Sequence, residues 1–86
     1  MATVTIELTS EEIVQRGKEI YYNQVLPAIK SGNEGRVVAI DVLSGEYELA
    51  DDAVASSHQL RARVSEPEIF FMRIGYPTMA RVLLSI

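Results

Sequence analysis

Two arginines and a tyrosine near the C-terminal end form the most distinctive polar group of this sequence. Arg73 interrupts a run of apolar residues, and Tyr76 and Arg81 follow it closely. A guanidinium in an otherwise apolar strand usually belongs to an ion pair, and we expect Asp41 or Glu48 on a neighbouring strand to be its partner. The same group could instead bind a carboxylate, a phosphate or an acidic segment of a partner. Arg73, Tyr76, Arg81 and Asp41 are therefore the candidate partner- or ligand-binding residues, with a structural ion pair as the favoured interpretation.

The acidic residues offer a second candidate chemistry, the binding of a divalent metal ion. Asp41, Glu46 and Glu48 lie close together, and Asp51 and Asp52 follow them. Hard cations need convergent oxygen ligands, but the spacing of a calcium-binding loop does not occur here. We interpret these acids as a solvated strand face and a helix cap, and we predict no metal site and no cofactor.

Nucleophilic catalysis has little support in the sequence. His58 is the single histidine, and cysteine does not occur. Neighbouring positions on a helix point about 100° apart, so Ser57 and His58 do not form a nucleophile and base pair by proximity. Ser44 precedes a glycine and fits ordinary turn chemistry. We therefore predict no catalytic residues, and we expect a non-enzymatic protein.

Composition narrows the range of partners. The 86 residues carry a formal charge of −4, which argues against a general affinity for nucleic acid or anionic lipid. The absence of cysteine, of an export signal and of a long apolar run predicts a cytoplasmic protein that does not contact membranes. The charge is unevenly spread, since residues 1–52 hold ten acids and four bases whereas residues 53–86 hold two acids and four arginines.

The elements that must position these residues are organised around a hairpin over residues 35–49. Val37 to Val42 is β-branched and apolar, as a strand buried on both faces should be, and residues 46–49 alternate as a half-solvated neighbour would. Leu43-Ser44-Gly45 forms the loop, with glycine where a three-residue hairpin needs a positive φ.

Two helices are expected. Thr9 and Glu12 have the spacing of a capping box, so a helix begins there and is kinked, or given a separate last turn, by Pro27. The second helix spans about 51–64, with a narrow stripe of small residues that should lie close on the sheet. This stripe consists of Ala53, Val54, Ser57, Leu60 and Val64.

Three further strands complete the expected fold. Residues 3–8 alternate as an edge strand, and residues 68–74 form an apolar strand beside the central one. Ala80 to Ile86 alternates as a last strand, with a short helix around Thr78 to Leu83 as the alternative. The whole chain, 1–86, is one α+β domain in the order β-α-β-β-α-β-β. We expect a single mixed or antiparallel sheet of four to five strands with both helices on one face. A second apolar sheet face is then left for a partner chain or a second copy to cover.

The chain resembles a family of small, uncharacterised bacterial proteins. The family pattern is G-K-x-V-A-I-D-x-x-S-G-D-Y-E-I followed by R-I-G-Y, and the resemblance covers roughly residues 11–82. It is carried by Ile20-Tyr21, Val25 to Pro27, Gly35 to Asp41, Ser44 to Glu48 and Arg73 to Pro77. Arg36 replaces the usual lysine and Glu46 the usual aspartate. The family has no assigned activity, but some members are encoded beside small toxin-like or protease-like genes, which implies an antitoxin-like or other partner-binding role.

Three functions are therefore open. The first is a non-enzymatic protein-interaction module, a homodimer or a binder of another protein, that uses its uncovered sheet face or an edge strand. The second is a small-ligand binder or enzyme that uses Arg73, Tyr76, Arg81 and Asp41. The third is nucleic-acid binding through the arginine-bearing C-terminal half, which the net charge disfavours.

Overall fold

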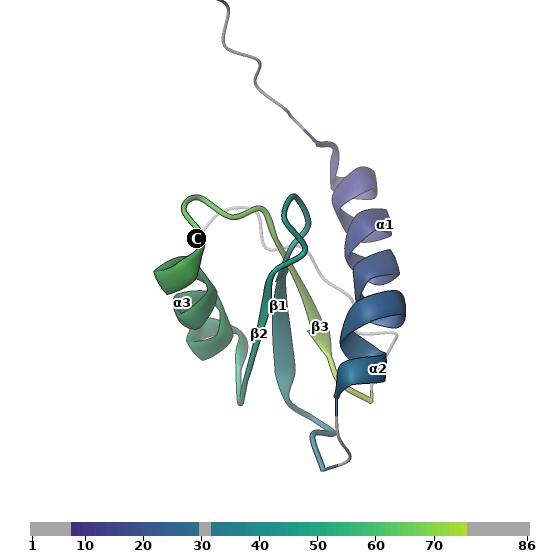
Figure 1. Cartoon of the computed structure of the whole chain (residues 1–86), viewed down its shortest axis with the longest axis vertical. Coiled ribbons are helices and arrows are strands. Elements are labelled where there is room, and N and C mark those ends of the chain that lie inside the picture. The colour runs from purple at the N-terminus through teal and green to yellow at the C-terminus, as the bar shows by residue number, and fades with distance from the viewer. Residues whose placement is uncertain (1–7, 30–31, 76–86) are drawn as a thin grey trace, which may run out of the picture.

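The computed structural model describes residues 8–29 and 32–75 as one layer of sheet between helices (Figure 1). Helix α1 (Ser10–Ile20) continues through a π-helical turn, η1 (Tyr21–Val25), into the short helix α2 (Leu26–Ala28). Strands β1 (Val37–Asp41) and β2 (Tyr47–Ala50), helix α3 (Ala53–Arg63) and strand β3 (Ile69–Arg73) follow. The α+β class is confirmed. The strands predicted over 3–7 and 80–86 lie outside the described residues, and Leu8 is not part of a strand.

The sheet has three described strands, all antiparallel, in the order β2-β1-β3. Val38 pairs with Leu49 on β2 and with Met72 on β3. All five residues of β1 are buried, because the strand has neighbours on both edges and side chains packed on both faces. The predicted central strand and its two neighbours are therefore confirmed. The loop between β1 and β2 has Gly45 at φ 85°, as predicted.

Helix α1 begins at the predicted capping box. The Thr9 backbone N–H donates to Glu12 Oε1 at 2.9 Å, and the Glu12 N–H donates to Thr9 Oγ1 at 3.1 Å. Each side chain thus satisfies a donor that the first turn of a helix leaves free.

The interruption predicted at Pro27 takes the form of the π-helical turn. Pro27 has no N–H, and in a regular α-helix its ring would collide with the carbonyl of Asn23. The chain widens instead, so that the Leu26 N–H donates to the Tyr21 carbonyl, one residue further back than in an α-helix. Tyr21 and Val25, which begin and end the turn, are both buried.

The prediction that both helices cover one face of the sheet is wrong. Helix α1 and η1 lie over β3 and β1, where Ile13, Tyr21 and Val25 form one core with the side chains of Val38, Ile40, Phe70 and Met72. Helix α3 packs on β1 and β2 from the opposite side (Figure 1). The physical reason is β1 itself, whose alternate side chains Val37 and Ala39 are as apolar as Val38 and Ile40 and need a second cover.

The buried stripe of α3 also differs from the predicted one. Ser56 and Leu60 are fully buried, whereas Val54 is 66% exposed. Ser56 can face the sheet because its hydroxyl donates to the Ala53 carbonyl at 3.1 Å within the helix. Among the described helices, none is long and apolar enough to cross a membrane.

Candidate functional site

Asp41, one of the predicted site residues, is a structural acceptor at the end of β1. It is only 2% exposed. Its Oδ1 accepts the backbone N–H groups of Glu68 at 3.0 Å and Leu43 at 3.3 Å, and its Oδ2 accepts the Ser44 hydroxyl at 2.7 Å. The carboxylate therefore ties the β1–β2 hairpin to the segment that leads into β3. Because the Asp41 carboxylate accepts three hydrogen bonds, it stabilises the fold.

Arg73 lies at the other end of the sheet from Asp41, and Glu48, the other predicted partner, is bonded to Arg63, so neither of the predicted ion pairs forms. Arg73 pairs in register with Val37, while Asp41 pairs with Ile69. Four residues along β1 separate the two positions, a distance of about 13 Å. The Arg73 side chain is exposed and donates from Nη1 to the Gly35 carbonyl at 2.8 Å.

The predicted group of four is consequently divided. Tyr76 and Arg81 lie outside the described residues, and Arg73 lies at the end of β3, opposite Val37. Asp41 belongs to the opposite end. A ligand site that combines Asp41 with Arg73 therefore does not form within the described part of the chain.

Glu46 and Glu48, interpreted as a solvated strand face, are bridged by Arg63 of α3. Arg63 donates from Nη1 to Glu46 and from Nε to Glu48, both at 2.6 Å, and from Nη2 to the Tyr47 carbonyl at 3.0 Å. The hydrogen bond with Glu46 is the largest of the contributions that raise the pKa of Arg63. This clamp was not visible in the sequence, because fifteen or more residues separate Arg63 from its partners.

Arg36, which precedes β1 at the end of the sheet where Arg73 lies, is also paired. Arg36 Nε lies 3.4 Å from Asp51 Oδ1, and its Nη1 donates to Asn33 Oδ1 at 3.1 Å. Arg36 therefore does not add a free positive charge to the one on Arg73.

The remaining polar candidates are dispersed. His58 is exposed on α3, and the neighbouring Ser57 hydroxyl donates to the Val54 carbonyl at 2.9 Å, away from the imidazole. Within residues 8–29 and 32–75, no three His, Cys, Asp or Glu side chains converge in a way that could hold a metal ion.

Among the elements that the structure describes, no helix covers one side of β3. Because α3 packs on β1 and β2, the β3 side chains on that side of the sheet, Ile69, Phe71 and Arg73, extend beyond it. Ile69 and Phe71 are half-buried and Arg73 is exposed. We call these three side chains the open face. The edge of β3 that is turned away from β1 has no described strand beside it.

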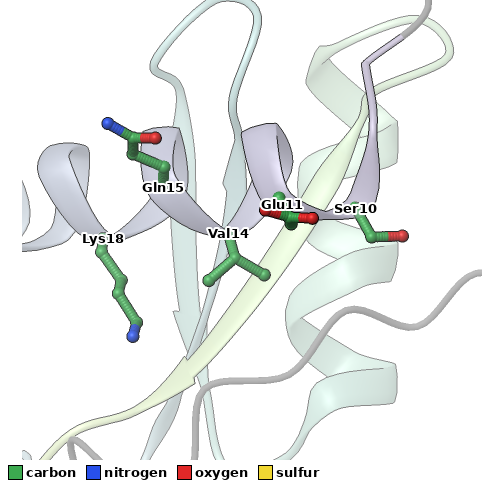
Figure 2. Close-up of a pocket in the computed structure, with 5 residues that line it drawn as sticks. All are labelled: Ser10, Glu11, Val14, Gln15 and Lys18. Carbon is green, nitrogen blue, oxygen red and sulfur yellow. The ribbon is translucent and has the colours of Figure 1, made fainter.

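A shallow groove runs along α1 on the other side of the sheet. It is lined by Ser10, Glu11, Val14, Gln15 and Lys18, and its wall is almost wholly apolar because the longer side chains contribute their methylene groups. Figure 2 shows Val14 and Lys18 projecting to the same side of the helix, and Gln15 to the other. Val14 is half-buried against the main core. Sequence reasoning missed this groove, although the four-residue spacing of Val14 and Lys18 could have indicated it.

The geometry defines a small α+β protein in which Asp41, Ser44 and Arg63 stabilise the fold and in which the half-buried Ile69 and Phe71 lie beyond α3. Comparison of the chain with protein families, with curated proteins and with solved structures finds no match. The resemblance to the bacterial family therefore stays a prediction.

Proposed function

We propose that this protein is a non-enzymatic protein-interaction module that self-associates through the open face of β3. The observation that carries the proposal is the position of Ile69 and Phe71, two large apolar side chains beside a sheet edge and beyond the reach of α3. Fully burying a side chain of this size from an exposed state contributes about 1.5–3 kcal/mol, and the half-buried Ile69 and Phe71 would each contribute part of that in an interface. An antitoxin-like role is one version of this function, in which the self-associated form binds a second protein.

A second copy is the occupant that we propose for the open face. A twofold axis near Phe71 would place Ile69 and Phe71 of one copy against the same side chains of the other. Arg73, the exposed member of the open face, would then lie at the rim of the interface.

The fates of the polar residues also support a non-enzymatic role. A catalytic group needs an unengaged atom near a concave site. Asp41 and Ser44 are bonded to each other and to the backbone of the hairpin, and Arg63 holds Glu46 and Glu48. The side chains of these residues stabilise the fold.

The test is the solution mass by light scattering over a dilution series of the full chain. We expect a mass near twice 9.6 kDa that falls toward 9.6 kDa on dilution. Phe71→Thr, which keeps the β-branched character of a strand residue, should shift the midpoint to a concentration on the order of ten times higher or more.

The matched control is Val54→Thr, a change of an exposed apolar residue on α3, outside the open face. It should leave the midpoint where the wild type has it. A wild-type mass of one chain at every concentration would overturn the proposal, and so would equal midpoints for wild type and Phe71→Thr when circular dichroism shows both to be folded.

A further inference from the structure

We infer that α3 is a cover that opens as a unit while the sheet and α1 stay folded, and that its release extends the open face across β1 and β2. The inference concerns the regulation of the surface to which we assign self-association. Its consequence for association rests on the proposed function, whereas the opening of α3 does not.

Helix α3 has little apolar surface with which to hold the sheet. Only two of its eleven residues, Ser56 and Leu60, are buried, and the hydroxyl of Ser56 is bonded within the helix. Leu60 is not a member of the main core, to which α1 and η1 contribute Ile13, Tyr21 and Val25. Elements with few buried apolar contacts open at a lower free energy than the rest of a domain. Helix α3 is therefore the element of this fold most ready to separate from the sheet.

The Arg63 clamp fastens the C-terminal end of α3 to β2. Arg63 lies in the last turn of the helix, and its guanidinium donates to Glu46, to Glu48 and to the Tyr47 carbonyl. The Arg63 side chain is 45% exposed. Ion pairs at such positions stabilise a fold only weakly, because water and salt compete for both partners. The clamp therefore closes α3 onto the sheet and can break without the loss of buried apolar surface.

The connections at the two ends of α3 are suited to act as hinges. Asp51 and Asp52, both exposed, link β2 to the helix. Beyond the helix, Glu66 has φ 50°, a left-handed conformation that is uncommon for residues with a side chain. Glu66 also precedes the buried Pro67, and the residue before a proline favours extended backbone. The closed position of α3 thus includes a strained residue, and opening would let that residue relax.

Release of α3 would uncover apolar side chains that continue the open face. Val37 and Ala39 of β1 and Ala50 of β2 are buried on the side of the sheet where α3 packs (Figure 1). In the register of the sheet, Ala39 lies opposite Phe71, and Val37 lies opposite Ala50. The uncovered side chains would therefore join Ile69 and Phe71 in one apolar surface across the three described strands.

The test is native-state amide exchange of the full chain at several low urea concentrations. A released helix of eleven residues does not keep its hydrogen bonds in water, so opening is seen as exchange of the α3 amides. The Leu60 amide should exchange faster than the Val38 and Ile40 amides of β1. Its exchange should also depend less on urea, because opening of α3 exposes less surface than global unfolding does. Equal rates with equal urea dependence would overturn the inference.

Two variants separate opening of α3 from global unfolding. Ile13→Val weakens the packing of α1, which is the same whether α3 is closed or open. It should therefore speed exchange in β1 by roughly two- to tenfold and leave the α3 rates unchanged. Arg63→Gln should speed exchange in α3 by roughly threefold or more. Arg61→Gln, a matched change in the same turn, should leave the α3 rates within about a factor of two of wild type.

Equal acceleration of α3 and β1 by Ile13→Val would show that α3 opens only when the whole domain unfolds, and would overturn the inference. Wild-type exchange of α3 in Arg63→Gln would overturn the role of the clamp.

Light scattering of Arg63→Gln over a dilution series tests the consequence for association. A larger population of the open form should lower the midpoint concentration by roughly the factor by which α3 exchange is raised. An unchanged midpoint would overturn the regulatory role of α3. The two proposals fail separately, because a monomeric mass of the wild type contradicts self-association, while the exchange of α3 relative to β1 does not depend on it.

Discussion

Gly17 lies on the buried side of α1, where the helix crosses Phe70 of β3. A Cβ atom at this position would overlap the Phe70 ring. Helix α1 can therefore lie close to β3 because residue 17 has no Cβ atom. Phe70 is fully buried beneath it.

Gly17→Ala should destabilise the protein, although the same change inside a helix ordinarily stabilises it by about 1 kcal/mol. Overpacking costs about 1–3 kcal/mol and can exceed that gain. We expect a net loss of up to about 2 kcal/mol in the free energy of unfolding, measured by urea denaturation. Gln59→Ala, at an exposed position of α3, is the control and should change the free energy by less than about 0.5 kcal/mol. A stabilising Gly17→Ala would contradict the contact with Phe70.

Asp41→Ala tests whether this carboxylate serves the fold or a ligand. The substitution leaves the N–H groups of Glu68 and Leu43 without their acceptor, and each buried donor left unpaired costs about 1–3 kcal/mol. We expect a loss on the order of 2–4 kcal/mol in urea denaturation. Ser44→Ala removes only one of the three donors and should cost clearly less. Unchanged stability in Asp41→Ala would restore Asp41 as a candidate for ligand binding.

The first turn of α1 depends on the ionised state of Glu12. Hydrogen bonds from the Thr9 backbone and then from its hydroxyl hold the pKa of Glu12 below its usual value of 4.5. A carboxyl whose pKa is lowered by folding contributes stability above its unfolded pKa, and this contribution is lost as the pH falls through the folded pKa.

We therefore expect the start of α1 to fray as the pH falls below 4.5, seen as a loss of helical chemical shifts at Ser10 to Ile13 in NMR spectra. Glu12→Gln keeps an oxygen acceptor for the Thr9 N–H but does not titrate, so its shifts should not change over the same range. If Glu12→Gln frays at the same pH as the wild type, another group controls the end of the helix.

The three-layer arrangement gives the molecule an uneven distribution of stability. Val38, Ala39 and Ile40 have no exposed surface, because strands cover both edges of β1 and helices cover both of its faces. Backbone amides in such a position open only when the whole domain unfolds.

Native-state amide exchange should accordingly be slowest in β1, at the rate of global unfolding, and faster in β2, where Tyr47 to Leu49 are partly exposed. The measurement is NMR-detected exchange at several low urea concentrations. Similar exchange rates in the two strands would mean that the sheet does not have β1 as its most protected strand.

The fold brings one arginine of the basic half of the chain against two carboxylates of the acidic half. Arg63 belongs to the arginine-bearing half of the chain, and its partners Glu46 and Glu48 belong to the acidic half. Arg36 and Asp51 form a looser pair, which lies wholly within the acidic half. The hypothesis that the arginine-bearing half binds nucleic acid is weakened by this, because Arg63 is already engaged by two carboxylates.

The local features were determined by the sequence alone. The capping box at Thr9, the break before Pro27, the hairpin with Gly45 and the apolar strand β1 all depend on residues close together in the chain, or on the residue pattern within one element. Short-range sterics and hydrogen bonding fix such features before any tertiary contact forms.

The tertiary structure decided which elements share a face and which polar residues meet. Nothing in the spacing of α3 indicated that it would cover the side of β1 opposite α1, since its small side chains are poorly segregated into apolar and polar stripes. The separation of Asp41 from Arg73 follows from the antiparallel register of β1 and β3, which places the end of one strand beside the start of the other. Periodicity identifies a face within each element, but only packing among elements selects the side of the sheet on which that face is buried.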